Sequence, residues 1–527
     1  MLLPYSVFVS ILLGASPLAP VNGSSGWRTS RAAGLKAFES GSYAAAEKCF
    51  QEALDAAGQT SSNEVKAISL ADLAKTYRAE GKYQAALPLE YQALAIVERE
   101  NGPESAEVCA RLNDLAAILQ SMGRYREAEP LYHRSIAIAE KRTDPVVVSL
   151  LSNLASLEGA SGRYADAEEH YRKGLELAQK LLGSRSLTTA LVLNNLGVAC
   201  RNRGRYGEAR DLYGRSLAIR QKLQGPSHPD VAAVLLNLGE VYGLQGLPRE
   251  AEVLTERALD IRERSLGPGH PLVADTLNNL GAIANNRGDY ARAEANYQRA
   301  LEIWRKIGGT ESSQMAAGWN NLAQVYLNEH RYDEARALLM RAAAAWTTAL
   351  GPDHAYLAPV STNLANVYIA RHKWADARRC LERALEINRK QFGAESLPAA
   401  RSQADLASFL STRHLYAEGE QLFASALSIE ARVEGGNVEM PRTMANLAAN
   451  FAQQGRYAEA ASLYGRALPD LERQTSRDST RLLSVMDSYV ETLRKLQNYA
   501  EAEKLEVRAT GLRVKNALLS ESAGATH

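Results

Sequence analysis

Apolar and small residues in this chain recur three and four positions apart in short stripes, which is the period of amphipathic α-helices. Between Ser227 and Gly308 one stripe precedes a short turn and a second stripe follows it, and this pattern then repeats 42 residues later. Leu235 and Leu238 of the first copy, for example, correspond to Leu277 and Leu280 of the second. The spacing therefore predicts units of two helices joined by a turn.

The turn supplies a marker for every unit, because a tyrosine or its substitute follows the turn glycine at a fixed position. Eight of the eleven intervals between successive markers are 42 residues. A fixed period of this length is typical of a repeat array, and the pattern predicts an all-α chain of twelve helical hairpins. The markers are Tyr43, Tyr83, Tyr125, Tyr164, Tyr206, Pro248, Tyr290, Tyr332, Trp374, Tyr416, Tyr457 and Tyr499.

Two further positions keep their character from unit to unit. Three residues after each marker the chain has alanine, or glycine at Gly419. We expect the second helix of a unit to cross the first at this point, where a larger side chain would push the pair apart. Seven residues after the marker a bulky residue such as Phe50 or Tyr132 is usual, and we expect it in the core between the helices.

These motifs resemble those of a known family. Trp319-x2-Leu322-Ala323-x2-Tyr326, followed by Ala335 and Leu339, is similar to the tetratricopeptide repeat. The longer period and the junctions of the type L-G-P-x-H-P resemble the kinesin light chain type of this repeat. The resemblance implies a right-handed superhelical solenoid of about twelve repeats. The chain lacks the long heptad segment by which kinesin light chains attach to their motor, so we do not carry over a cargo-adaptor role.

Composition excludes several classes of function. The 527 residues carry 61 Lys and Arg against 60 Asp and Glu, a formal charge of +1, so no overall field would attract nucleic acid. The four cysteines and nine histidines are scattered without ligand-like spacing, so we expect neither a metal nor another cofactor. The chain has no phosphate loop, nucleophile elbow or separate domain for a catalytic site, so we do not expect an enzyme.

The two ends differ from the repeats. A short apolar run over Val7–Ala15 precedes Val21-Asn22-Gly23, whose small residues suit a signal peptidase. We therefore expect a signal peptide over residues 1–23, the repeat array over residues 24–516 and a disordered tail over residues 517–527. Cleavage would place the mature chain in the periplasm or outside the cell, whereas an uncleaved leader would leave it cytoplasmic. No later segment approaches the ~20 apolar residues of a membrane span, so we expect none in the mature chain.

The clearest candidate for function is a polar residue eleven positions before each marker. Ten consecutive units have Asn or Asp there, although Asn in a helix interior is less favourable than Ala by up to ~0.7 kcal/mol. The family resemblance implies that the first helix of each unit lines the inside of the superhelix, where this residue hydrogen-bonds the backbone of an extended peptide. Amides three and seven positions later lie on the same side of the helix. The predicted peptide-binding residues are Asn153, Asn195, Asn202, Asn237, Asn279, Asn286, Asn321, Asn328, Asn363, Asn366 and Asn446.

Two interpretations of these asparagines stay open. A carboxamide donates and accepts, so a row of them can pair with the N–H and C=O groups of any extended chain. Alternatively, each Asn joins one repeat to the next, or does both. Nearby arginines could select acidic groups of a ligand; they are Arg78, Arg201, Arg401, Arg442 and Arg494.

We therefore predict a non-catalytic scaffold that binds an extended segment of a protein partner in an Asn-lined concave groove. The alternative is a structural spacer or self-assembling scaffold whose convex faces and terminal repeats make the contacts. The sequence identifies neither the partner nor the oligomeric state.

Overall fold

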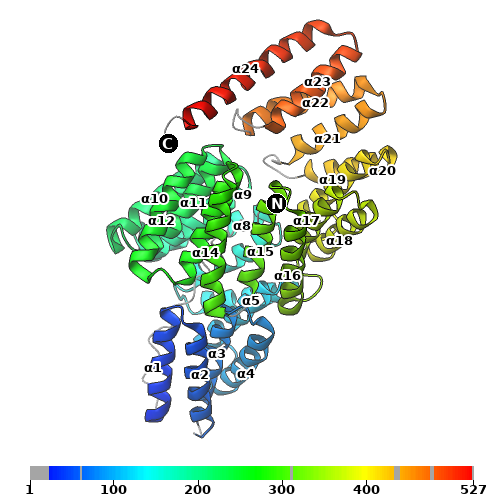
Figure 1. Cartoon of the computed structure of the whole chain (residues 1–527). Helices are drawn as coiled ribbons and strands as arrows, with labels where there is room; N and C mark the ends of the chain where they lie inside the picture. Colours follow the sequence, from blue (N-terminus) through cyan, green and yellow to red (C-terminus); the bar gives the residue numbers. More distant parts are fainter. Residues whose placement is uncertain (1–22, 60–61, 309–311, 433–438, 475–479, 525–527) are drawn as a thin grey trace. The chain divides into compact units, whose positions relative to one another are not determined.

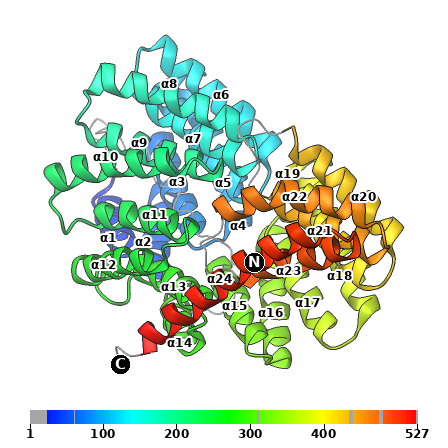
Figure 2. The same cartoon turned by 90° about the horizontal axis from the view of Figure 1, so that it is seen from above.

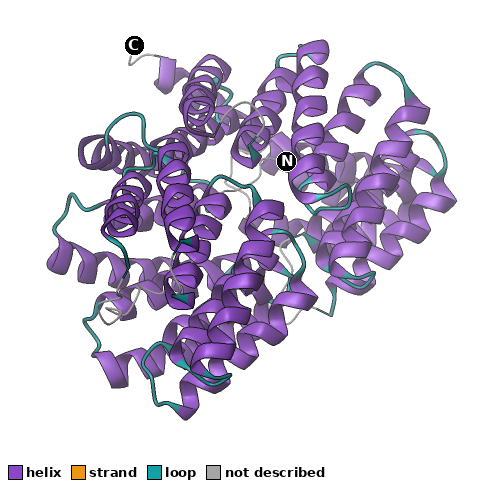
Figure 3. Ribbon diagram, turned by 90° about the horizontal axis from the view of Figure 1, so that it is seen from below, coloured by secondary structure: helices purple, strands orange, loops and turns teal. Residues whose placement is uncertain are grey.

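The predicted all-α array is confirmed by a computed structural model, which describes residues 23–59, 62–308, 312–432, 439–474 and 480–524. These residues form twenty-four α-helices and contain no strand (Figures 1 and 3). We call the first helix of each pair helix A and the second helix B. The A helices are α1 (Ser25–Glu39), α3 (Asn63–Ala79), α5 (Ala106–Ser121), α7 (Val147–Ala160), α9 (Leu187–Asn202), α11 (Pro229–Leu244), α13 (Pro271–Asn286), α15 (Ser313–Asn328), α17 (Leu357–Ala370), α19 (Leu397–Thr412), α21 (Met440–Gln453) and α23 (Thr480–Lys495).

All the B helices of the described chain begin at the residue that marks the turn in the sequence. This agreement confirms the predicted register of the repeats. The B helices are α2 (Tyr43–Gly58), α4 (Tyr83–Asn101), α6 (Tyr125–Lys141), α8 (Tyr164–Leu182), α10 (Tyr206–Gln224), α12 (Pro248–Leu266), α14 (Tyr290–Gly308), α16 (Tyr332–Leu350), α18 (Trp374–Phe392), α20 (Tyr416–Glu430), α22 (Tyr457–Gln474) and α24 (Tyr499–Gly524).

The turn between helix A and helix B needs a left-handed backbone conformation. Glycine supplies it in most repeats, for example at Gly41 and Gly81, where φ is 73° and 78°. Histidine takes the same conformation in three later repeats, at His330, His372 and His414. Two of these rings contact the tyrosine that begins helix B, since Nδ1 of His330 lies 2.8 Å from the Tyr332 hydroxyl and His414 repeats the arrangement.

Within a pair, the two helices pack on the small residue three positions into helix B. Figure 2 shows the pairs α7–α8 and α9–α10 from above. The eleven alanines and Gly419 at this position are buried. In several repeats a glycine of helix A faces the bulky residue of helix B, so that a Cβ at Gly197 would lie 2.7 Å from the Tyr213 ring. The predicted close crossing is thus confirmed, and the aromatic rings fill the core beside it.

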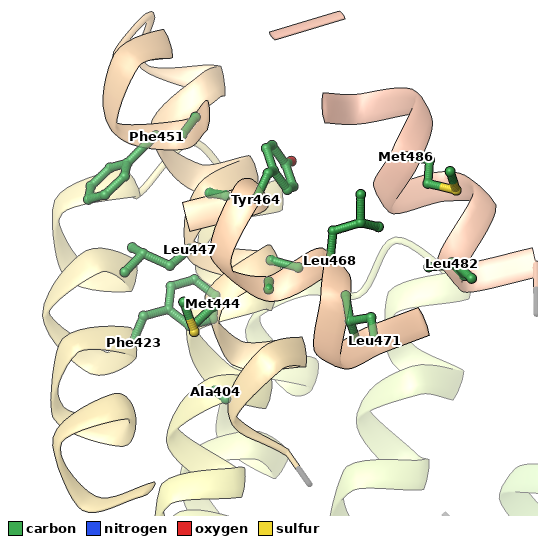
Figure 4. Packing of buried hydrophobic residues seen from close by; sticks show 14 of the residues in the cluster. Ala404, Phe423, Met444, Leu447, Phe451, Tyr464, Leu468, Leu471, Leu482 and Met486 are labelled. Carbon is green, nitrogen blue, oxygen red and sulfur yellow. The ribbon is translucent and has the colours of Figure 1, made fainter. Parts of the chain in front are cut away.

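The chain divides into two compact units, and each has its own core. The first comprises residues 1–241 and 249–373, and the second comprises residues 242–248 and 374–527. In the second unit a continuous apolar cluster runs from Ala404 and Phe423 through Met444 and Tyr464 to Met486 (Figure 4). Repeat arrays bury a continuous core by stacking neighbours in this way.

In the first unit the chain returns to contact itself after about six repeats. Figure 1 shows the blue helices α1–α4 beneath the green helices α14–α16, and α14 contacts α2 while α16 contacts α4. At this contact Gln314 Nε2 donates a hydrogen bond of 3.4 Å to the Ala79 carbonyl. A cavity of about 150 Å³ lies between the two layers, lined in part by Tyr43, Glu80 and Asp275. Burial raises the pKa of the Asp275 carboxyl to about 6.

The ends of the array differ in part from the prediction. The predicted signal peptide, residues 1–23, lies outside the described residues except for Gly23. At the other end, helix α24 continues to Gly524, so residues 517–524 are helical where the sequence pattern predicted a disordered tail. The segment from Ala517 to Ala523 is built from Ala, Leu, Ser and Glu without Gly or Pro, and this composition suits a helix.

Candidate functional site

The candidate residues lie on the A helices. Consecutive A helices contact each other, as α3 contacts α5, α5 contacts α7, α13 contacts α15 and α15 contacts α17. Each of these helices also packs against the B helix of the preceding or the same repeat.

Asparagine side chains connect these neighbouring A helices directly. Asn321 Nδ2 on α15 donates to Asn278 Oδ1 on α13 at 3.1 Å, and Asn363 Nδ2 on α17 donates to Asn320 Oδ1 at 3.0 Å. The donor in each bond is the residue eleven positions before the turn marker, and the acceptor is the residue just before the equivalent position in the preceding repeat. We call these bonds the amide ladder; its pairs are Asn113–Asn153, Asn194–Asn237, Asn278–Asn321 and Asn320–Asn363.

A second bond within two of these repeats extends the ladder. Asn194 Nδ2 donates to Asn195 Oδ1 at 3.2 Å, and Asn320 Nδ2 donates to Asn321 Oδ1 at 3.3 Å. The acceptor residue of one rung therefore orients its neighbour on the same helix. Because both amides of each rung are buried, these hydrogen bonds form where water cannot replace them.

The predicted peptide-binding asparagines divide into two groups by exposure. Asn153, Asn195, Asn237, Asn321 and Asn363 are buried in the packing of the A helices. The others keep a surface toward solvent: Asn286 and Asn366 are exposed, and Asn202, Asn279, Asn328 and Asn446 are half-buried.

Among the half-buried residues, the contacts vary. Asn328 Nδ2 donates to Asn285 Oδ1 at 3.0 Å, and in the second unit Asn446 Nδ2 donates to the Ser408 hydroxyl at 3.2 Å. Asn202 accepts hydrogen bonds from the Arg201 guanidinium.

Asn279 is an exception to the ladder. The preceding repeat has Leu236 at the position that would supply the acceptor. Within the part of the chain that the structure describes, Asn279 makes no hydrogen bond to the preceding A helix. Its amide therefore stays available, although it occupies the same register position as the buried ladder residues.

Half-buried and exposed amides lie on three successive A helices of the first unit. We call this group the inner amide stripe; it comprises Asn279 and Asn286 on α13, Gln324 and Asn328 on α15, and Asn366 on α17. Gln324 Nε2 donates to Asn328 Oδ1 at 3.4 Å, so the two amides on α15 are aligned with each other.

Four of the arginines predicted to select acidic groups are already paired with carboxylates of the chain itself. Arg201 is buried against Glu240, and Arg401 pairs with Glu439. Arg442 Nη2 lies 2.9 Å from the same Glu439, and Arg494 Nη2 lies 2.6 Å from Glu506. A ligand carboxylate would have to displace these internal partners.

The first three repeats line a different kind of hollow. A cavity of about 260 Å³ opens among α3, α4, α5 and α6, with the charged residues Asp72, Arg111 and Asp114 on its wall. Arg111 Nη1 lies 2.8 Å from Glu90, a buried carboxylate that replaces the usual bulky residue of helix B. Burial raises the pKa of Glu90 to about 7, while the charge of Arg111 acts in the opposite direction.

The sequence pattern gave no role to the ladder acceptors. The signal that identifies them is the asparagine doublet: Asn194-Asn195, Asn278-Asn279 and Asn320-Asn321 each place an acceptor just before the expected inner residue. An Asn at this position accepts a ladder bond only when the next repeat has Asn eleven positions before its own turn marker. The two residues of a ladder pair can therefore be recognised only by comparing successive repeats.

No helix in the described ranges has the length and apolar character to cross a membrane. Across the same residues, no three His, Cys, Asp or Glu side chains come together as a metal ion would require.

Comparison with known proteins identifies the repeat. The tetratricopeptide repeat model matches residues 29–99, 91–141, 146–222, 188–264, 230–306, 314–390, 358–414 and 398–473. No curated protein matches the chain.

Several solved structures are similar to parts of the chain. BtubC (BKLC) from P. vanneervenii is 28% identical, with 44% of this chain and 92% of that chain covered and a TM-score of 0.36. A putative kinesin light chain from Podosopora anserina with nearly identical TPR-like repeats is 23% identical, with coverages of 39% and 97% and a TM-score of 0.33. Yeast Tom70 is 14% identical, with coverages of 92% and 96% and a TM-score of 0.43.

Proposed function

Because the chain belongs to the tetratricopeptide repeat family, we propose that it binds an extended segment of a partner protein across the inner amide stripe on α13, α15 and α17. Its repeats are those of a protein–protein interaction scaffold. The proposal adds the place and the mode of binding: amides of the scaffold pair with the backbone of the segment, and no chemical reaction follows.

The observation that carries the proposal is the difference between Asn279 and Asn321. Both stand eleven positions before a turn marker, yet Asn321 is buried in a ladder bond and Asn279 is half-buried, with Leu236 at the acceptor position of the preceding repeat. An Asn in a helix interior without a structural bond works against helix stability, and a ligand supplies a reason for it. Asn286 and Asn366 extend the same available surface to both sides.

The spacing of the helices suits an extended chain. Packed helices lie about 8–10 Å apart, and an extended chain advances about 3.3 Å per residue. A bound segment would therefore pass one A helix about every three residues and would cover all three helices with about six to nine residues. Carboxamides that reach backbone N–H and C=O groups give affinity with little dependence on the side chains of the segment.

Affinity capture from a native extract tests the proposal with two variants and the wild type. Removing Asn279 and Asn366 together should reduce the recovery of partners, since each lost hydrogen bond contributes about 0.5–1.5 kcal/mol and two or more bonds correspond to roughly tenfold in affinity. The matched control is Gln298→Ala, which removes an exposed carboxamide from the B helix α14. Equal recovery by the double variant and the control would refute binding at the stripe.

A captured segment allows a sharper test of the mode of binding. A synthetic peptide of that segment should bind about as well when exposed side chains are exchanged. The same peptide should bind at least several-fold more weakly when alternate backbone nitrogens are methylated, because methylation removes the N–H donors. If methylation has no effect and side-chain exchange abolishes binding, recognition by backbone amides is wrong.

A further inference from the structure

The contact between distant repeats of the first unit follows a simple rule. The turn after helix A of an early repeat meets the start of helix A about six repeats later. A Cβ at Gly41 would lie 2.7 Å from Pro271 Cδ, and a Cβ at Gly81 would lie 3.4 Å from Ser313 Cβ. Pro271 and Ser313 are the first residues of α13 and α15. Each therefore lies against the turn glycine of an earlier repeat.

The third contact of the series involves His354, in the junction before α17. His354 is buried, and its ring interacts with the Ser121 backbone at the end of α5. Three successive junctions, those before α13, α15 and α17, are thus covered by the turns of the first three repeats. We call the side of the array that carries the junctions the junction edge, and the side that carries the A-to-B turns the turn edge.

The junction edge continues into earlier repeats, where the same positions are uncovered. Leu187, the first residue of α9, stands two periods before Pro271 and is 40% exposed. Leu182, at the end of α8, is 38% exposed, whereas Leu350 at the same position four repeats later is 7% exposed. Leu181 and Leu223 occupy one register position in successive repeats and are 48% and 52% exposed.

These four residues lie at the junction positions of two successive repeats, and we call them the leucine edge: Leu181, Leu182, Leu187 and Leu223. In the first unit a turn covers the junction that lies about six repeats later. Within the described array no turn stands six repeats before α9, so the leucine edge is not covered in this way. Exposed apolar residues that gather at one place on a surface mark a site of interaction.

We propose that the leucine edge binds the turn edge of a second copy of this chain, so that the contact seen within the first unit is repeated between molecules. The occupant follows from continuity with that contact, in which a turn covers a junction. This inference concerns the edges of the array and does not depend on peptide binding at the inner amide stripe.

The turn that suits the leucine edge is the last one, between α23 and α24. Leu496 and Tyr499 at this turn are exposed and apolar. The exposed carboxylates Glu501 and Glu503 follow in the first turns of α24. Lys180 and Lys222 stand in the last turns of α8 and α10 on the leucine edge, and Arg494 and Lys495 precede the turn at the end of α23. The two edges therefore match in apolar surface, and continuity with the contact inside the first unit identifies the occupant.

A junction edge on one molecule and a turn edge on another make a heterologous contact. Such a contact uses two different surfaces, so each molecule that joins still presents a free edge of each kind. The expected products are chains of two, three and more molecules whose proportion rises with concentration. The small apolar area places the contact among weak, transient interfaces.

Sedimentation velocity of the full chain over a concentration series tests the proposal. Wild type should show a series of oligomers, while Leu187→Glu and Tyr499→Lys should each reduce association on the order of tenfold, as burying a charge in a small interface requires. Val253→Glu, on the exposed surface of α12, is the matched control and should associate as wild type does. Circular dichroism verifies that each variant retains its helices, and Leu223→Glu replaces Leu187→Glu if that variant loses them.

Mixing the two defective variants separates this proposal from other modes of association. Leu187→Glu keeps an intact turn edge and Tyr499→Lys keeps an intact leucine edge, so an equimolar mixture should form dimers and stop there. A wild type that stays monomeric at all concentrations would overturn the proposal. That result is expected if another protein, or another part of the same molecule, covers the leucine edge. A mixture that stays monomeric, or variants that assemble like wild type, would overturn it as well.

Discussion

Replacing Asn321 with alanine should destabilise the array at α13 and α15. The substitution removes the donor to Asn278 Oδ1 at 3.1 Å and the acceptor for Asn320 Nδ2 at 3.3 Å, and all three side chains are buried. Two buried groups, Asn278 Oδ1 and Asn320 Nδ2, thus lose a partner, and each buried polar group left without its partner costs about 1–3 kcal/mol. The gain in helix propensity from Asn to Ala offsets up to ~0.7 kcal/mol of this cost. We therefore expect a loss of about 2–4 kcal/mol in the free energy of local unfolding.

Hydrogen exchange is the suitable assay, because a long repeat array unfolds in parts and has no single free energy of unfolding. Amides of α13 and α15 should exchange faster in Asn321→Ala, and amides in α21 and α23 of the second unit should be unchanged. Asn366→Ala is the control, since Asn366 is exposed on the next A helix and should lose no protection.

A double-mutant cycle with Asn278→Ala isolates the ladder bond itself. Removing both partners should cost less than the sum of the single variants, with a coupling energy of about 1 kcal/mol. If Asn321→Ala protects α13 and α15 as well as Asn366→Ala does, or if the two single variants add without coupling, the ladder does not stabilise the array.

The remaining predictions concern packing and pH. Gly197→Ala should lower the stability of α9 and α10 by about 1–3 kcal/mol in hydrogen exchange, because the new Cβ would lie 2.7 Å from the Tyr213 ring. The control Gly214→Ala, at an exposed position in the middle of α10, should instead stabilise the helix by about 0.5–1 kcal/mol. Equal effects of the two substitutions would contradict this packing. Burial lowers the pKa of His354 to about 4, below its unfolded value of about 6.5, so its contribution to stability is complete above pH 6.5 and is lost as the pH falls toward 4. The protection of α17 should therefore decrease over this range in wild type and much less in His354→Gln, and an equal decrease in both would show that another group is responsible.

The sequence predicts most of what depends on one repeat. The turn markers identify the start of the B helices, and the small residue three positions later predicts the crossing point, because both depend on contacts inside a hairpin. The sequence does not predict the return contact between Gly41 and Pro271, since its offset depends on the small rotation from each repeat to the next, added over six repeats.

The candidate site likewise combines a feature that one repeat predicts with a feature that depends on two repeats. The position eleven residues before the marker is recognisable in sequence, but Asn279 and Asn321 look alike there. Their difference comes from the preceding repeat, where Leu236 or Asn278 stands opposite. Whether an amide is joined to a neighbour or left available thus depends on pairs of residues about 43 positions apart.

We propose that the inner asparagines divide into a ladder that holds the repeats and a stripe that holds a partner. Hydrogen exchange and affinity capture on Asn279→Ala and Asn321→Ala, each made singly, test this division most directly. The account predicts that Asn279→Ala keeps the protection of α13 and α15 and recovers less partner, whereas Asn321→Ala loses that protection. Loss of protection in Asn279→Ala with undiminished recovery of partners would contradict it.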